Sequence, residues 1–285
     1  MKRVLLIGGS GRLGTSIRRR WRDCEIVAPA HGELDLSDAG ALAREVARIR
    51  ADVLINCAAF HDVDRCETEP VPAFLTNAIA VAGAARVARD AGAAFVTVST
   101  DYVFDGAADS PYTENDAPHP LSVYGTSKLA GEYLVESLGG RAFVVRTCGV
   151  YGPAESESRR PGLVERVLAS GEGGPLRVVG DVYASPTFAG DLADALRRLI
   201  ETSAYGLYHA VNAGPVSWYD FAAETARLAR VDAAIEPIRA RERTSAAPRP
   251  RFSALSSAKL AALGIPMPSW REGLAAYLGV SRTFG

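Results

Sequence analysis

A chain of 285 residues, 48% of them hydrophobic, can bury a substantial core, and its length fits one large domain with an additional lobe. The formal net charge is −1 and no block of like charges occurs, so we expect neither nucleic acid nor an anionic membrane as a partner. Chemistry on a small molecule is the class of function that these properties favour.

The first apolar run, Val4 to Ile7, stops at Gly8-Gly9 and is followed by a polar, basic segment, which indicates a buried strand rather than a signal peptide. No apolar stretch of the sequence approaches the ~20 residues that a membrane span requires. We therefore expect a cytoplasmic protein. The four cysteines and four histidines show no zinc-ligand spacing, so we expect reduced thiols and no metal.

Strand-like apolar runs alternate with amphipathic helical ones along the first half of the chain. This alternation is typical of a parallel sheet covered on both faces, the doubly wound α/β (Rossmann) architecture. The runs are Val4 to Ile7, Leu13 to Trp21, Val53 to Cys57, Val71 to Ala91, Phe95 to Ser99, Tyr124 to Leu138 and Phe143 to Arg146.

The pattern loosens after Tyr151-Gly152-Pro153, where shorter helical and strand-like stretches follow one another. We predict that residues 1–150 and 187–204 form a dinucleotide-binding domain. Residues 151–186 and 205–285 then form a smaller C-terminal lobe that closes over a substrate.

A glycine-rich turn lies between the first strand and the first helix. It reads Gly8-Gly9-Ser10-Gly11-Arg12-Leu13-Gly14, in which Gly8, Gly11 and Gly14 have the spacing that lets a pyrophosphate approach the backbone at a helix N-terminus. This turn predicts a nicotinamide dinucleotide held by Gly8, Gly11, Arg12, Leu13 and Gly14.

The choice between NADPH and NADH depends on the end of the second strand. No carboxylate stands in Ala28 to His31 to repel a 2′-phosphate, which Arg12 or His31 could instead meet, so NADPH is favoured and NADH stays possible. Asp35, beside Leu36, lies about twenty residues past the turn and can be interpreted as a ribose ligand or as a cap on the adenine pocket.

Tyr124 and Lys128 stand four residues apart on a predicted helix, and Thr100 ends a predicted strand. Reduction of a carbonyl by a nicotinamide needs a proton donor, and a tyrosine has a pKa of about 10, which we expect Lys128 to lower. Lys128 can also hold the nicotinamide ribose, and the Thr100 hydroxyl can bond the substrate oxygen. For Asp101, a substrate contact and a local turn are both open.

With these residues in hand, the chain resembles the extended short-chain dehydrogenase/reductases and, within them, the dTDP-4-dehydrorhamnose reductase family. The resemblance runs over nearly the whole chain and is carried by a few segments. They are Asn56-Cys57-Ala58-Ala59, the loop-like Val63 to Pro70, Ser99 to Gly106, Tyr124 to Glu132 and, more weakly, Arg146-Thr147, Tyr183 to Thr187 and Arg249-Pro250.

The resemblance implies reduction of the 4-keto group of a dTDP-linked 6-deoxyhexose by NAD(P)H, with Thr100, Tyr124 and Lys128 as the catalytic group. It also implies that Ala58 and Ala59 line the cofactor. Residues implied at the substrate are Val63, Thr100, Asp101, Tyr102, Tyr124, Gly149 and, at the diphosphate, Arg249.

Two positions depart from the family pattern. Gly149 stands where an aromatic residue is expected against the sugar, which leaves the exact sugar open, and Ser16 stands where some members have a magnesium-binding Glu at a dimer contact. We expect a monomer or a homodimer without metal. Two alternatives stay open: an epimerase of the same fold, and a non-catalytic NADP-binding regulatory subunit.

Overall fold

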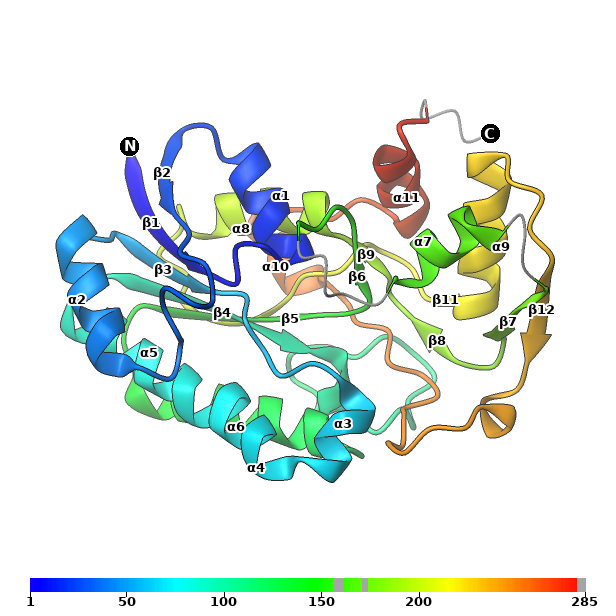
Figure 1. The fold of residues 1–285 in the computed structure, drawn as a ribbon, viewed down its shortest axis with the longest axis horizontal. Helices are drawn as coiled ribbons and strands as arrows, with labels where there is room; N and C mark the ends of the chain where they lie inside the picture. The colour runs from blue at the N-terminus through cyan, green and yellow to red at the C-terminus, as the bar shows by residue number, and fades with distance from the viewer. Residues whose placement is uncertain (156–160, 171–173, 281–285) are drawn as a thin grey trace.

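A computed structural model describes residues 1–155, 161–170 and 174–280 of the chain. Its centre is a six-stranded sheet in the order β10-β5-β4-β3-β1-β2 (Figure 1). All neighbouring strands of this sheet run parallel. The strands are β1 (Lys2–Ile7), β2 (Cys24–Val27), β3 (Val53–Asn56), β4 (Ala94–Thr100), β5 (Ala142–Thr147) and β10 (Gly206–His209).

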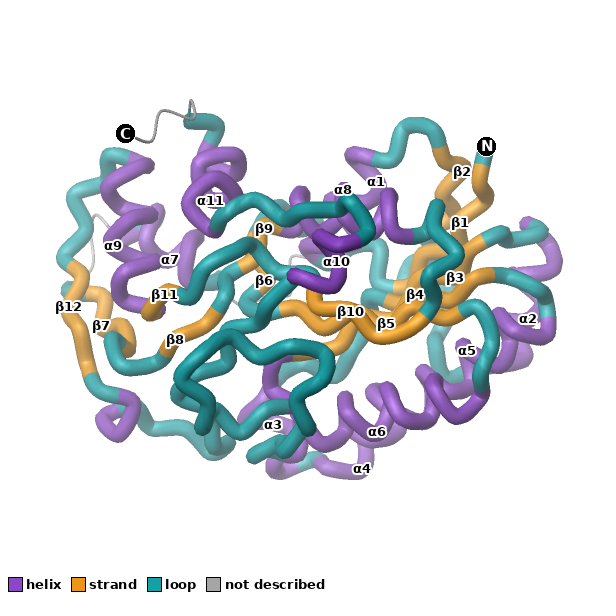
Figure 2. The backbone as a smooth tube through the Cα atoms, turned by 180° about the vertical axis from the view of Figure 1, so that it is seen from behind, coloured by secondary structure: helices purple, strands orange, loops and turns teal. Residues whose placement is uncertain are grey.

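Helices cover both faces of this sheet, as Figures 1 and 2 show from opposite sides. One face carries α1 (Arg12–Arg20), α8 (Ala189–Leu199) and α10 (Ala258–Ala262), and the other carries α2 (Ala39–Ile49), α5 (Val81–Asp90) and α6 (Val123–Leu138). The predicted doubly wound α/β fold is therefore confirmed.

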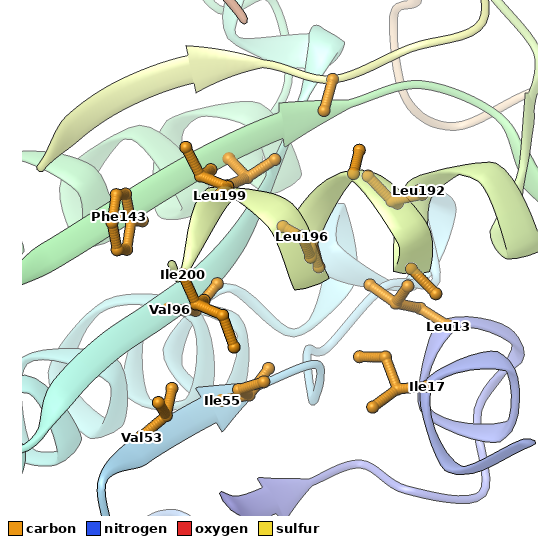
Figure 3. Packing of buried hydrophobic residues seen from close by; sticks show 14 of the residues in the cluster. Leu13, Ile17, Val53, Ile55, Val96, Phe143, Leu192, Leu196, Leu199 and Ile200 are labelled. Atoms are coloured by element: carbon orange, nitrogen blue, oxygen red, sulfur yellow. The ribbon is translucent and has the colours of Figure 1, made fainter. Parts of the chain in front are cut away.

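Buried side chains join these helices to the sheet. On the first face, Leu13 and Ile17 of α1 meet Leu192 and Leu196 of α8 above Ile55 of β3 (Figure 3). Each of these five side chains is at most 7% exposed. Their burial stabilises the sheet on which the functional residues stand.

The order of the strands changes direction at one point of the sheet. β1 pairs with β2 on one side and with β3 on the other, so the chain reverses direction across the sheet between β1 and β3. In open α/β sheets, ligands bind at the carboxyl ends of the strands at such a reversal.

The helical run predicted from Val71 to Ala91 is confirmed, but its apolar length differs from the expectation that no stretch approaches a membrane span. α4 (Pro70–Phe74), the π-helical η1 (Leu75–Ala80) and α5 run on continuously, so that residues 70–90 form a 21-residue helix apolar enough to cross a membrane by length and composition alone. However, 56% of its most apolar window is buried inside the protein. Packing against the sheet and neighbouring helices accounts for its composition.

The remaining elements form the lobe on the right of Figure 1 and two short connections. The lobe packs α7, α9 and α11 against small strand pairs, β7 with β12 and β8 with β11. The elements are β6 (Val150–Tyr151), α7 (Leu163–Leu168), β7 (Leu176–Val179), β8 (Tyr183–Ala184), β9 (Thr187–Phe188), β11 (Val216–Ser217), α9 (Trp218–Ala229), β12 (Ile235–Ile238), η4 (Ala240–Glu242) and α11 (Trp270–Leu278), with α3 (Val63–Thr68) and η2 (Asp101–Val103) as the connections.

The predicted domain limits stay a prediction, with one observation against the limit at residue 205. β10, which those limits put in the lobe, pairs along its whole length with β5 and belongs to the central sheet. Three stretches of the predicted lobe, residues 156–160, 171–173 and 281–285, lie outside the described residues.

Candidate active site

The predicted catalytic residues lie at the carboxyl edge of the sheet. Thr100 ends β4 and is the register partner of Thr147, which ends β5. Helix α6 starts nearby, where the Ser122 hydroxyl caps it by accepting a bond from the Gly125 amide at 3.2 Å. The cap fixes the first turn of the helix, which carries Tyr124.

Helix α6 approaches its neighbours closely enough to exclude side chains at two positions. A Cβ on Gly125 would lie 2.2 Å from the carbonyl oxygen of Tyr102, and one on Gly131 would lie 2.3 Å from that of Asn77. Backbone contact thus sets where α6 lies against the segments that follow β3 and β4.

The side chain of Thr100 lies close enough to the phenol of Tyr124 to affect its pKa. The ring of Tyr102 lies edge-on to that of Tyr124, with 5.9 Å between the centroids. Burial raises the pKa of Tyr124, and the Thr100 hydroxyl offsets this only partly. The expected lowering of this pKa is therefore wrong for this structure, and the phenol is the protonated species at neutral pH.

Lys128 lies one helical turn beyond Tyr124 and is 4% exposed. Its Nζ donates a hydrogen bond to the Val98 carbonyl oxygen of β4 at 2.6 Å. Burial lowers the pKa of Lys128 to about 8, against the opposing effect of the Glu132 carboxylate. The ammonium is thus fixed to the sheet and titrates close to neutral pH.

Asp101, the residue after Thr100, is buried, and its hydrogen-bond partners are other side chains of the protein. Its carboxylate accepts bonds from the Ser253 hydroxyl at 2.6 Å, the Cys148 thiol at 3.1 Å and the Thr100 hydroxyl at 3.1 Å. Burial raises its pKa despite these bonds. This geometry makes Asp101 a group that orients Thr100, a use that the sequence did not suggest.

The sequence also missed Asn77, which is 1% exposed within the π-helical segment. Its Oδ1 accepts from the Phe60 amide at 2.9 Å, while its Nδ2 donates to the Phe60 carbonyl at 3.0 Å and to the Ser127 hydroxyl at 3.0 Å. Ser127 in turn donates to the carbonyl of Tyr124 at 2.8 Å. Asn77 therefore positions α6, and a lone amide in an apolar helix was its one sequence signal.

The glycine turn fits a dinucleotide. Gly8 has a φ of +80°, and a Cβ there would lie 2.8 Å from the Ala58 amide nitrogen. A Cβ on Gly14 would lie 2.3 Å from the Gly8 carbonyl oxygen. Gly11 caps α1 without a side-chain bond, and the first turn of α1 holds no acidic residue. The free N–H groups at this helix start suit a pyrophosphate.

Arg12 and Leu13 follow in the same turn, and their side chains have different partners: Leu13 lies in the core, whereas Arg12 contacts the lobe. The Arg12 Nη2 donates to Glu165 Oε1 of α7 at 2.9 Å, an ion pair that joins the sheet domain to the lobe. Arg12 Nε and Glu165 Oε2 are both buried without a hydrogen-bond partner, so the pair leaves one donor and one acceptor unsatisfied.

The second predicted cofactor segment forms a turn after β2. Asp35 is exposed, and its Oδ1 accepts from the Ser37 amide at 2.8 Å and the Ser37 hydroxyl at 2.7 Å. Leu36 is buried in the core on the other face. Ala59, after β3, is partly exposed beside Ala58.

The segment expected to be a loop after β3 contains the short helix α3. The Asp62 carboxylate caps it by accepting from the Arg65 amide at 3.1 Å, and Arg65 pairs with Glu69 one turn later. Val63, a predicted substrate contact, is its first residue and is partly exposed.

Arg249 reaches this helix from the lobe. Its Nη1 and Nη2 donate to Asp64 Oδ1 at 3.2 Å and Oδ2 at 3.0 Å, and Ser245 and Ala247 bond to the same carboxylate. Burial alone raises the pKa of Asp64, but these bonds lower it well below its usual value. The predicted phosphate ligand is thus engaged by a carboxylate in this structure.

Gly149 follows β5 and is exposed at the carboxyl edge of the sheet. Its φ is +51°, and a Cβ there would lie 2.5 Å from Cη2 of Trp218 in α9. Ser16, by contrast, is 3% exposed inside α1, which removes it from any surface contact.

With this geometry established, similarity to known proteins decides the family. A family model described as the RmlD substrate binding domain matches residues 1–282. The chain belongs to this family. The predicted membership is confirmed.

Relatives extend over nearly the same length. The spore coat polysaccharide biosynthesis protein SpsK of Bacillus subtilis is 35% identical and aligns over 98% of this chain and 97% of its own. A dTDP-4-dehydrorhamnose reductase of Streptomyces griseus is 36% identical, over 95% of this chain and 91% of its own. A crystal structure of dTDP-4-dehydrorhamnose reductase from Bacillus anthracis in complex with NADP has a TM-score of 0.92 at 35% identity, covering 97% of this chain and 99% of that one.

Proposed function

We propose that this protein reduces the 4-keto group of a dTDP-linked 6-deoxyhexose, with NADPH as the reductant and NADH as a possible substitute. Membership of the family and the reductases among its relatives support this activity. The observation that carries it is the close approach of the Tyr124 phenol and the Thr100 hydroxyl at the end of β4, in a sheet whose first turn has the glycine geometry of a dinucleotide site.

Tyr124 is the proton donor in this proposal. Its raised pKa keeps the phenol protonated until charge develops on the substrate oxygen. Without substrate, the one proton of the Thr100 hydroxyl is donated to Asp101 at 3.1 Å. In this proposal that proton turns to the substrate oxygen, so that Thr100 becomes the second hydrogen-bond donor to it. The proton leaves Tyr124 Oη for the oxygen of the former ketone, which becomes a hydroxyl.

NADPH supplies the hydride to the carbonyl carbon when it is bound. The residues that would hold it are Gly8, Gly11 and Gly14 at the pyrophosphate and Lys128 at the nicotinamide ribose. Arg12, Leu13, Asp35, Leu36, Ala58 and Ala59 complete the proposed cofactor surface.

The test uses purified protein with NADPH and dTDP-4-keto-6-deoxyglucose. We expect one NADPH oxidised for each ketone reduced, followed at 340 nm and by product chromatography. A folded protein that oxidises no NADPH with this ketone would contradict the proposal. Interconversion of sugars without net oxidation of NADPH would instead identify an epimerase.

The assembly and location are coarser parts of the proposal. We infer a monomer or homodimer acting in the cytoplasm on a small nucleotide sugar, without nucleic acid or membrane as a partner. Light scattering of the purified protein at micromolar concentration tests the assembly, and a tetramer would contradict it.

A further inference from the structure

Gly149 and Trp218 occupy one place at the carboxyl edge of the sheet. Gly149 is exposed, its φ is +51°, and any Cβ there would meet the Trp218 ring at 2.5 Å. That contact is with Cη2, the far edge of the indole, which thus lies over the exposed backbone at the end of β5. The missing side chain of Gly149 is what lets the ring lie there.

Trp218 is held firmly from the side of the lobe. It is the first residue of α9, its amide donates to the Val182 carbonyl at 3.3 Å, and its ring meets Phe221 edge-on with 6.2 Å between centroids. Trp218 also packs against a buried cluster to which Phe104 and Cys148 belong. Even so, Trp218 is only partly buried, so part of its surface is accessible.

The same corner contains the proposed oxygen-binding group. Cys148, next to Gly149, donates its thiol to Asp101 at 3.1 Å, and Asp101 accepts from Thr100 at 3.1 Å. Thr100 and Thr147 are partners across β4 and β5. Two hydrogen bonds therefore connect Cys148, the neighbour of Gly149, with the Thr100 hydroxyl that we place on the substrate oxygen.

We propose that the Trp218 indole forms the lobe-side wall of the hexose pocket and that Gly149 keeps the space it needs. The inference rests on the proposed sugar-nucleotide reduction and adds a residue that selects the sugar. An aromatic ring offers an apolar surface to the C–H groups of a pyranose. Such a wall accepts the methyl group of a 6-deoxyhexose, whereas a 6-hydroxyl there would lose its hydrogen bonds to water.

Tryptophan fluorescence tests this contact directly. The chain has three tryptophans, of which Trp21 and Trp270 are 3% and 5% exposed, so Trp218 is the one whose surroundings a ligand can change. We expect dTDP-L-rhamnose to shift the emission of the wild-type protein and dTDP alone to shift it much less. The shift should vanish in Trp218→Phe and persist in Trp270→Phe.

Trp270→Phe is a matched control because Trp270, like Trp218, packs edge-on to Phe221. Steady-state kinetics gives the second readout. Trp218→Leu should raise the KM for the keto-sugar by about tenfold or more and leave the Kd for NADPH within about twofold, because the ring touches the sugar and not the cofactor. Gly149→Ala should act in the same direction by displacing the ring.

The outcomes separate this inference from the proposed function. If the wild type turns over but dTDP-L-rhamnose leaves its emission unchanged at concentrations that inhibit turnover, the inference is wrong and the function stands. An unchanged KM in folded Trp218→Leu has the same meaning. If Trp218→Leu does not fold, the wild-type and Trp218→Phe emission spectra decide. A folded wild type without turnover overturns both.

Discussion

The catalytic edge and two of the ion pairs that join the sheet domain to the lobe, Arg12–Glu165 and Arg249–Asp64, arrange polar groups in different ways. At the edge, the Tyr124 phenol lies near the Thr100 hydroxyl and Lys128 bonds to the β4 backbone, all within the sheet domain. Between the sheet domain and the lobe, Arg12 and Arg249 pair with carboxylates 153 and 185 positions away along the chain. Tyr124 and Lys128 are therefore positioned within the sheet domain, where Ser253 of the lobe adds a bond to the neighbouring Asp101. The two ion pairs, by contrast, depend entirely on how the lobe is placed.

The two ion pairs also differ from each other. The Arg249–Asp64 pair is bidentate, and Ser245 and Ala247 add bonds to its carboxylate. The Arg12–Glu165 pair has one bond and leaves two buried atoms unsatisfied. The fully hydrogen-bonded Arg249–Asp64 pair holds the lobe against α3. The Arg12–Glu165 pair, which has an unused donor on Arg12, retains the capacity to bind another anion.

The largest effect is expected at the edge. Tyr124→Phe removes the proton donor but keeps the ring against Tyr102, so we expect kcat to fall by about 10²–10⁴-fold. NADPH binding, measured by its own fluorescence, should stay close to the wild-type value. Retention of most of the activity would show that another group supplies the proton.

The pH dependence should report Lys128. Its lowered pKa means that the free enzyme loses this charge as pH rises through about 8, while the raised pKa of Tyr124 keeps the phenol protonated there. We expect kcat/KM to fall by about tenfold per unit above pH 8. A profile that stays flat to pH 10 would show that the ammonium is not needed.

Substitutions in the Arg12–Glu165 pair should change NADPH affinity by smaller factors, and in opposite directions for the two residues. Glu165→Gln removes the carboxylate that competes with an anion for Arg12, so NADPH should bind roughly threefold to tenfold more tightly. Arg12→Gln should weaken NADPH binding by a similar factor. Fluorescence titration at constant ionic strength measures both, and tightening in neither variant would assign the pair to domain contact alone.

The smallest effect is expected at the Arg249–Asp64 ion pair. Asp64→Asn leaves Arg249 without its charged partner, but the Asp64 side chain is 41% exposed, so solvent screening limits the loss of stability to about 1 kcal/mol. Because the folded-state pKa of Asp64 is lowered from 3.8, its contribution is present above that pH and is lost as pH falls below it. Denaturant unfolding of both proteins at pH 7 and pH 3.5 should show the difference shrinking at the acidic pH.

The features of the site that could be predicted from the sequence depend on residues that are close together along the chain. The glycine turn and the Tyr124–Lys128 spacing involve neighbours within seven residues, and strand ends follow from apolar runs. The structure brings these local signals to one edge of the sheet, as parallel pairing requires. The alternation of strands and helices likewise sufficed for the fold class.

What the sequence did not predict depends on distant partners or on burial. Nothing near Arg12 in the chain indicates Glu165, and nothing near Gly149 indicates Trp218. The direction of the Tyr124 pKa was wrong because burial, which outweighs the neighbouring groups, is a property of the folded chain. Helix α3 was missed because its cap and its ion pair lie in a short polar segment that also suits a loop.

The close approach of α6 at Gly125 and Gly131 has a consequence for redesigning the enzyme. Because backbone atoms 2.2 and 2.3 Å from the would-be Cβ atoms set the position of this helix, its tyrosine and lysine keep their places whatever side chains the lobe carries. Substrate range can then be altered by exchanging lobe residues such as Trp218, while the proton-donating machinery is carried over intact.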